Sequence, residues 1–247
     1  MRYQTRYRSF TTSDYLPNGV KWLLIANVGL FVLYYVFPSL AEHLLLLSLV
    51  PVMVVKHLAL WQLATYMFLH GGIFHILFNM LALWMFGTEL ERIWGSRYFL
   101  KFYLVTGIGA GALTVLVSLL PFPFAGALRQ AVVIGASGAI YGLLLAYALY
   151  FPTRPIYMYL VFPIPAKYFV MIMGAIAFYS SLGTGGGVAN ATHLGGLLVG
   201  YVFLKGVHIH PLAEVKYRYL KWKINRVRRK FDVYSGGRAD DWDRRIH

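Results

Sequence analysis

Six long runs of apolar residues dominate the sequence, and few charges interrupt them. A helix needs roughly 20 mainly apolar residues to cross the hydrocarbon core of a bilayer. Helices also satisfy their own backbone hydrogen bonds there, which lone strands and loops cannot do. The pattern therefore predicts an all-α polytopic membrane protein with six transmembrane helices. The expected helices cover about residues 20–37, 72–94, 98–120, 136–151, 167–181 and 191–206.

The composition excludes an ordinary water-soluble domain. Only 13% of the residues are charged and 59% are hydrophobic, whereas soluble domains carry roughly a quarter charged residues. The absence of cysteine excludes a disulfide scaffold, a thiol nucleophile and a cysteine-ligated metal. The first apolar run is long and lacks a small-residue cleavage site, so it is expected to be a retained span and not a signal peptide.

The basic residues indicate the orientation of the helices. Of 23 lysines and arginines, only Lys56 and Arg129 lie in the connections after the first, third and fifth runs. Because basic residues collect on the cytoplasmic side, both termini are predicted to be cytoplasmic. A bacterial inner membrane suits so compact a chain. The net charge of +14 thus reflects topology, and no motif for nucleic acid accompanies it.

The sequence predicts three parts: a cytoplasmic arm at 1–19, the membrane core at 20–207 and a basic cytoplasmic tail at 208–247. The tail carries eleven basic and five acidic residues from position 211 onward. Apolar residues recur in it at helical spacing, which fits an interfacial helix on the anionic inner leaflet; a tail without structure is the alternative. These residues are Leu212, Val215, Tyr219 and Trp222.

The connection at 39–70 is long and contains an apolar piece that Pro51 interrupts. It is too short for a span and is expected to lie in the membrane interface. Trp61 and Tyr66 are suited to anchor it among the headgroups.

Polar residues occur near the starts of three runs that descend from the outer side. These are His75 and Asn79 in the second run, Ser137 in the fourth and His193 in the sixth. The fourth run spans only ~24 Å at ~1.5 Å per residue, less than the ~30 Å hydrocarbon core. Ser137 is therefore expected at the floor of a cavity that opens outward.

His193 shares one helix face with Gly196 and Gly200, because the three are spaced i, i+3 and i+7. The two glycines allow another helix to approach closely, and the GASG sequence at 135–138 offers a matching surface. Close approach would place His193 beside Ser137 as the general base that a serine nucleophile needs. Packing alone is the plain alternative, but ionisable residues inside a membrane are functional candidates by default.

His75 and Asn79 are i, i+4 neighbours and could join the Ser137 backbone N–H in an oxyanion hole. A hydrogen-bonded pair that only fixes helix packing is the alternative. Tyr141 lies one turn after Ser137 and could pack against the His193 ring, in a supporting and not a catalytic role.

The acidic residues restrict the chemistry. Of nine in the chain, only Glu42 lies on the outer side, and none lies in the outer half of a span. A Ser–His dyad is therefore favoured over a triad, and an aspartyl protease is excluded because it needs two buried carboxylates. No H-E-x-x-H motif supports a zinc protease, although His70, His75 and His193 could in principle meet a metal. We expect no metal and no cofactor.

Several motifs resemble the rhomboid family of intramembrane serine proteases, in order and in spacing across residues 20–207. They are GASG at 135–138, HILFN at 75–79, ERIWGSRYF at 91–99 and the last run with His193. The resemblance implies a rhomboid-like six-transmembrane-helix bundle that cleaves transmembrane protein substrates near their outer ends. It implies that Ser137 is the nucleophile, His193 the base, and His75, Asn79 and the Ser137 N–H the oxyanion donors. In one departure, Gln62 follows Trp61 where many members have arginine.

Other functions remain open at this point. A catalytically silent relative that binds transmembrane clients would not need the serine, the histidine and both donors. A small-solute transporter would show internal repeats or paired interrupted helices, and neither is visible. The glycine-rich connection at 182–190 could be a lid over the site or only a flexible turn. Glu89, Glu91 and Arg92 are expected to form a solvated or structural cap at the end of the second run.

Overall fold

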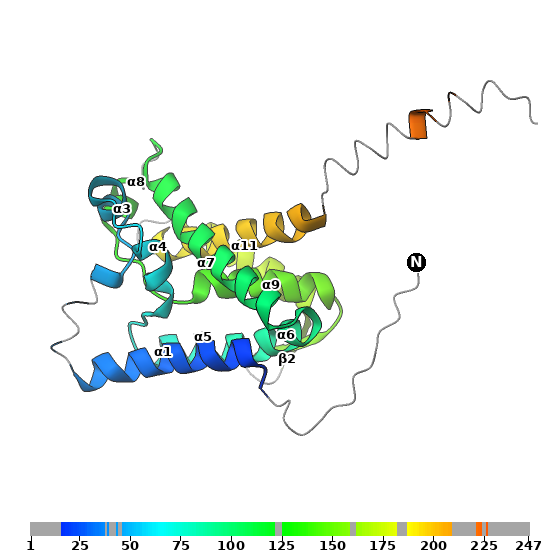
Figure 1. Cartoon of the computed structure of the whole chain (residues 1–247), viewed down its shortest axis with the longest axis horizontal. Coiled ribbons are helices and arrows are strands. Elements are labelled where there is room, and N and C mark those ends of the chain that lie inside the picture. The colour runs from blue at the N-terminus through cyan, green and yellow to red at the C-terminus, as the bar shows by residue number, and fades with distance from the viewer. Residues whose placement is uncertain are drawn as a thin grey trace, which may run out of the picture. The chain divides into compact units, whose positions relative to one another are not determined.

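The computed structural model of the chain describes residues 16–37, 39, 43, 46–121, 125–158, 162–181, 187–208, 221–223 and 226. Two compact units divide the chain, Met1–Leu204 and Lys205–His247, and Figure 1 shows the helices of the first. Most of the predicted arm, most of the predicted lid and most of the predicted interfacial tail helix fall outside the described residues. The predicted division into an arm, a core and a tail stays a prediction.

Helices make up most of the described first unit, as the all-α prediction requires. The long ones are α1 (Asn18–Val36), α7 (Ser96–Ser118), α9 (Ser137–Tyr150), α10 (Ala166–Ser181) and α11 (Gly187–His208). Shorter helices are α3 (Pro51–His57), α4 (Gln62–Thr65), the 3-10 helix η2 (Tyr66–Phe68) and α8 (Ala125–Gln130). One antiparallel hairpin, β1 (Pro155–Met158) and β2 (Phe162–Pro165), joins α9 to α10.

The second predicted run forms one helix in three segments. They are α5 (Ile73–Ala82), a π-helical turn η3 (Leu83–Gly87) and α6 (Thr88–Trp94). A π turn accommodates one more residue than an α turn, and such turns are frequent near functional sites.

Three of the described helices are long and apolar enough to cross a membrane. They are α1, the helix from Ile73 to Trp94, and α7. α9 and α10 are shorter apolar helices of 14 and 16 residues, so α9 is only ~21 Å long. The protein is a polytopic helical membrane protein, and the count of six spans stays a prediction.

The expected helix ends agree with the observed ones within a few residues, with one difference that matters. α11 begins at Gly187, four residues before the predicted start, so His193 lies in its second turn. Pro152 ends the fourth run as expected, because proline cannot continue a helix. Two elements lie in segments that were predicted to be connections, namely α8 and the β1–β2 hairpin. The apolar pattern does not predict either of them.

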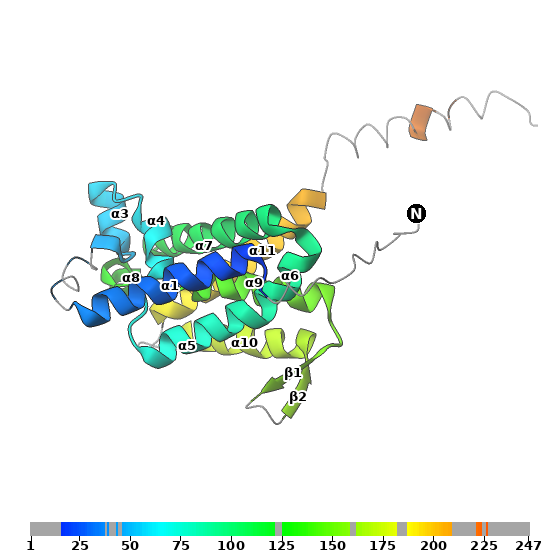
Figure 2. The ribbon, with the colours of Figure 1, turned by 60° about the horizontal axis from the view of Figure 1, so that its bottom comes forward.

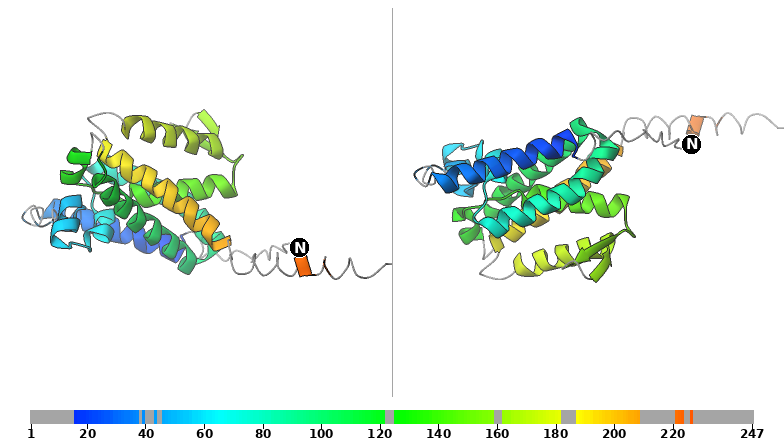
Figure 3. Two further views of the ribbon diagram at one scale, coloured as in Figure 1. Left: turned by 90° about the horizontal axis from the view of Figure 1, so that it is seen from above. Right: turned by 90° about the horizontal axis from the view of Figure 1, so that it is seen from below.

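α9 is the central helix of the bundle. Ten of its fourteen residues are buried. It packs against α7 and, through Gly138 and Gly142, against α11, while α10 lies at the edge (Figure 3). The outer helices expose large apolar side chains such as Trp22 and Phe178. In a membrane protein these side chains face lipid, where their exposure carries no cost.

Side chains at positions 61–65, after the apolar piece, hold the connection between α1 and α5 together through hydrogen bonds. Gln62 is 1% exposed; its Oε1 accepts the Val50 N–H at 3.1 Å and its Nε2 donates to the Leu46 carbonyl at 3.3 Å. Trp61 Nε1 donates to the same carbonyl at 2.8 Å, and the Thr65 hydroxyl donates to Leu47 at 2.6 Å. Gln62 thus ties this connection together.

The two glutamates at the end of the second run have different roles. Glu91 is 2% exposed and accepts the backbone N–H groups of Gly19 and Val20, each at 2.7 Å. These N–H groups belong to the first turn of α1, which has no intrahelical partners for them. Glu89 instead forms a half-exposed ion pair with Arg154. Glu91 is therefore a structural cap that joins α6 to the start of α1.

Candidate active site

Ser137 and His193 lie within hydrogen-bonding distance of each other. The Ser137 hydroxyl oxygen is 2.8 Å from His193 Nε2, although the residues are 56 positions apart. Ser137 begins α9, and both side chains are partly exposed. This geometry allows the imidazole to take the proton of the hydroxyl.

Glycines make this contact possible. α11 approaches α9 so closely that a Cβ placed on Gly196 would lie 1.9 Å from the carbonyl oxygen of Gly138. One turn further on, a Cβ on Gly200 would lie 3.1 Å from the Cα of Gly142. The two backbones are therefore in direct contact over one turn of each helix, directly after the Ser137–His193 pair.

Two further contacts orient the imidazole. The Tyr141 ring stacks on the His193 ring with centroids 4.2 Å apart and planes 6° from parallel. The hydroxyls of Thr192 and Thr114 are 2.8 Å apart, and Thr114 also donates to the Ala110 carbonyl. Either hydroxyl can be the donor in the contact between Thr114 and Thr192. α11 is thereby fastened to α7 next to His193.

The turn before Ser137 has a backbone conformation that favours glycine. Gly135 has φ +114°, and its N–H donates to the Tyr66 carbonyl at 2.9 Å. Upstream, Val133 exchanges two backbone hydrogen bonds with Leu49. The turn is thus attached to the α1–α5 connection, and it delivers Ser137 to the first position of α9, where backbone N–H groups have no intrahelical partner.

His75 lies against this turn. A Cβ on Gly135 would be 2.6 Å from His75 Nε2, so only glycine leaves room for the ring. His75 Nδ1 accepts the Gly71 N–H at 3.3 Å, which places the proton of a neutral imidazole on Nε2. His75 therefore presents an N–H donor beside the turn that carries Ser137.

Asn79 is buried one turn after His75 on the same helix face. Its Nδ2 donates to the His75 carbonyl at 2.7 Å. A side-chain amide has two N–H protons, so one remains for another acceptor. The bond to the His75 carbonyl orients the amide, and the oxyanion role of Asn79 stays a prediction.

The second ring nitrogen of His193, Nδ1, is buried and has no hydrogen-bond partner among the described residues. When Nε2 accepts the serine proton, Nδ1 carries the ring proton, and no carboxylate in that part of the chain orients it. Among the described residues the arrangement is therefore a pair of side chains, and the preference for a dyad over a triad stays a prediction. Within the same residues, no group of three or more histidines and carboxylates is arranged to hold a metal.

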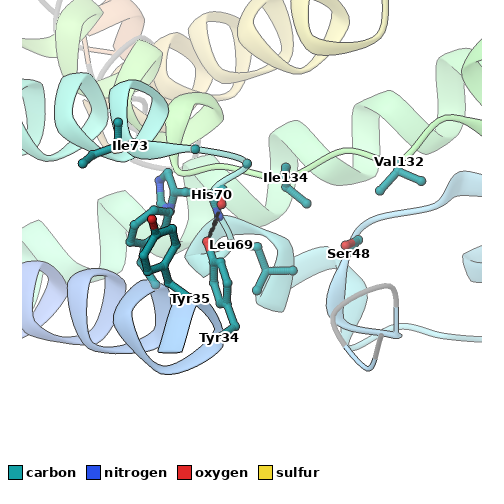
Figure 4. Close-up of a pocket in the computed structure, with 11 residues that line it drawn as sticks. Tyr34, Tyr35, Ser48, Leu69, His70, Ile73, Val132 and Ile134 are labelled. Atoms are coloured by element: carbon teal, nitrogen blue, oxygen red, sulfur yellow. Dashed lines mark hydrogen bonds between the residues drawn. The ribbon is translucent and has the colours of Figure 1, made fainter. Parts of the chain in front are cut away.

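A cavity of about 360 Å³ lies next to the segment that leads into His75 (Figure 4). His70 borders it and is 2% exposed, with its ring edge-on to His75 at 5.1 Å between centroids. Burial, together with the neighbouring His75, lowers the pKa of His70 to about 4. His70 is therefore neutral at physiological pH and adds no positive charge beside His75. Its backbone N–H donates to the Tyr34 hydroxyl at 3.0 Å, and the same hydroxyl donates to its carbonyl.

Two residues that position the site, Tyr34 and Tyr66, were not connected with it by the sequence pattern. Tyr66, expected as an anchor among the headgroups, is instead fully buried. Tyr34 holds the segment before His75 from α1, 36 positions away. Tyr66 accepts the Gly135 N–H and donates its hydroxyl to the Gly107 carbonyl at 2.7 Å. These bonds join distant segments through single polar atoms, which a local sequence pattern does not reveal. The glycine two positions before Ser137 was the one local signal for the turn.

The fold defines a class, the polytopic helical membrane proteins, with a serine and a histidine brought together at the start of a central short helix. Comparison with known families identifies the family within this class. A family model described as the Rhomboid domain matches residues 57–209. This is more than half of the chain, and the chain belongs to the rhomboid family.

Relatives come from bacteria, plants and yeast. The chain is 38% identical over 141 residues to "Rhomboid protease GluP" of Bacillus subtilis, across 57% of this chain and 25% of that protein. It is 29% identical over 175 residues to "RHOMBOID-like protein 2" of Arabidopsis thaliana, across 71% and 50%. It is 32% identical over 153 residues to "Rhomboid protein 1, mitochondrial" of Saccharomyces cerevisiae, across 60% and 41%. The chain thus spans a quarter to a half of the length of these relatives.

Proposed function

We propose that the protein is an intramembrane serine endopeptidase that cleaves transmembrane protein substrates near the outer face of the membrane. The observation that carries the proposal is the 2.8 Å contact between the Ser137 hydroxyl and His193 Nε2 in a membrane protein. Membership of the rhomboid family, which includes a relative named as a protease, supports the same reaction.

In this proposal Ser137 attacks the scissile carbonyl while His193 Nε2 takes its proton. The oxygen of the tetrahedral intermediate is stabilised by N–H donors that are already in place, as in other acyl-transfer sites. The His75 Nε2–H, the free amide proton of Asn79 and the Ser137 backbone N–H are the candidates. His193 then passes the proton to the leaving amine, and water hydrolyses the acyl-enzyme by the same steps. No cofactor is required.

A panel of single-span membrane substrates tests the proposal. The purified protein in liposomes is expected to cleave at least one of them, and Ser137→Ala is expected to abolish cleavage. A fluorophosphonate probe should label the protein, and His193→Ala should prevent the labelling because the hydroxyl is no longer activated. Equal cleavage by the wild type and Ser137→Ala would rule out the serine mechanism. Binding of substrates without cleavage or labelling would instead support the silent client-binding alternative.

The oxyanion donors give a graded prediction. Loss of one such donor typically costs ~10²–10³ in rate, so His75→Ala and Asn79→Ala should each lower kcat by about that factor. The measurement is single-turnover cleavage in liposomes, with fluorophosphonate labelling as a check that the Ser–His pair is intact. Phe78→Ala, on the exposed face of the same helix, is the matched control. If both variants retain wild-type rates, the polar pair only fixes packing.

The orientation and location also remain proposals. The distribution of the basic residues supports the proposal that both termini are cytoplasmic, which would put Ser137 and His193 toward the outer side. A bacterial inner membrane is the proposed location, and the basic residues after position 211 are proposed to contact its anionic inner leaflet.

A further inference from the structure

The hairpin between α9 and α10 is built almost entirely from apolar residues. Ile156 pairs with Ile164 and Tyr157 pairs with Pro163 in an antiparallel register. The stretch 155–165 reads PIYMYLVFPIP, eleven residues without a charged side chain. Figure 2 shows its two strands projecting from the helices beyond α10.

The hairpin exposes large apolar side chains on both of its faces, which is unusual for a sheet that meets water. Ile156 is buried, but Tyr157 is 56% and Phe162 61% exposed, and these two side chains lie on opposite faces of the hairpin because neighbouring residues alternate. Antiparallel sheets that meet water carry polar residues on the outer face. An exposed apolar strand with an open edge is a site of aggregation in water, so the hairpin requires another environment.

Its place in the chain puts the hairpin at the boundary of the membrane. It starts where the apolar helix α9 ends and finishes where the apolar helix α10 begins. Arg154 precedes it and Lys167 follows it. The Arg154 guanidinium lies 4.3 Å from the Phe151 ring centroid and pairs with Glu89, and Lys167 Nζ lies 4.7 Å from the Tyr168 ring centroid. Tyrosines together with snorkelling lysines and arginines are typical of the membrane–water interface.

We propose that the paired strands β1 and β2 insert into the headgroup region of the leaflet at this end of the bundle. Tyr157, Phe162 and Pro163, which are exposed, contact the upper acyl chains. Lys167 attracts anionic lipid headgroups because of its charge, whereas the charge of Arg154 is compensated by Glu89. The insertion is shallow. Open strand edges are not tolerated in the hydrocarbon core, whereas water and headgroups can satisfy them at the interface. The proposal is independent of the protease chemistry.

Site-directed spin labelling tests the position of the hairpin. The chain has no cysteine, so Tyr157→Cys and Phe162→Cys each provide a unique attachment site at an exposed position. The labelled full-length protein is placed in nanodiscs that hold one copy each, and power-saturation EPR compares accessibility to oxygen and to a water-soluble nickel chelate. Arg97→Cys, exposed at the start of α7, is the aqueous control, and Ile176→Cys, exposed on α10, is the lipid-facing control.

We expect the oxygen-to-nickel accessibility ratio at Tyr157 and Phe162 to exceed that at Arg97 several-fold and to stay below that at Ile176. A ratio equal to that at Arg97 would place the hairpin in water and overturn the proposal. A ratio equal to that at Ile176 would contradict the shallow insertion. Low accessibility to both reagents would show that another part of the protein covers the hairpin, and would also overturn it.

Discussion

Replacing Gly196 with alanine is expected to reduce cleavage by at least ~10²-fold, because a displacement of about 1 Å at a catalytic contact can cost that much. The added Cβ would lie 1.9 Å from the Gly138 carbonyl oxygen, far inside any real contact. That oxygen belongs to the backbone of α9 and cannot rotate away. α11 must therefore move outward and take His193 with it, which breaks the 2.8 Å contact with Ser137.

The measurement combines cleavage in liposomes with fluorophosphonate labelling of Ser137, and both should fall together. Gly29→Ala is the matched control, since nothing lies within 4 Å of a Cβ at that position of α1. Gly200→Ala, with its nearest contact at 3.1 Å, should give an intermediate loss. Thermal unfolding in detergent checks the fold, because overpacking costs about 1–3 kcal/mol. A folded Gly196→Ala protein with wild-type labelling would contradict the helix-contact explanation.

Removal of the Glu91 carboxylate is expected to lower the free energy of unfolding more than any of the other substitutions proposed above. Glu91→Ala leaves the buried N–H groups of Gly19 and Val20 without their acceptor and also removes the hydrogen bond from the Ser96 hydroxyl. Hydrogen bonds to charged groups are worth roughly 1.5–3 kcal/mol, and a stranded buried donor costs about 1–3 kcal/mol. The free energy of unfolding should therefore fall by several kcal/mol, on the order of 3 to 5.

Reversible unfolding in mixed micelles measures this change. Glu89→Ala is the matched control, because its ion pair with Arg154 is 37% and 44% exposed at the two side chains and such pairs contribute about 0–1 kcal/mol. Ser96→Ala should fall between the two. Equal stabilities of the Glu91 and Glu89 variants would show that the contact with the start of α1 contributes nothing.

The helices could be predicted from the sequence because lipid imposes a local rule. Every long apolar run must become a helix in lipid, and Pro152 marks an end directly. The approach of His193 to Ser137 was also predictable, since Gly196 and Gly200 share a face with the histidine. Each helix and each helix face was predicted from residues a few positions apart, although the contact itself joins residues 56 positions apart.

The remaining features depend on contacts between distant segments, which local patterns do not encode. Glu91 was expected to be a cap, but its partners Gly19 and Val20 lie more than 70 positions away. The apolar composition of residues 155–165 does not by itself predict strand pairing. The pairing also depends on the positions of α9 and α10, which the hairpin connects. The turn at Gly135 depends in the same way on the Tyr66 carbonyl.

The π turn at Leu83–Gly87 sets the rotational phase between the two halves of its helix. Each residue advances a helix by about 100°. The extra residue therefore changes the rotation of α6 about the helix axis relative to α5, so that the two halves present their polar side chains in different directions. α5 can direct His75 toward the Ser137 turn, while α6 directs Glu91 at the start of α1. A one-residue deletion there would leave both halves helical but twist one of these polar contacts out of alignment.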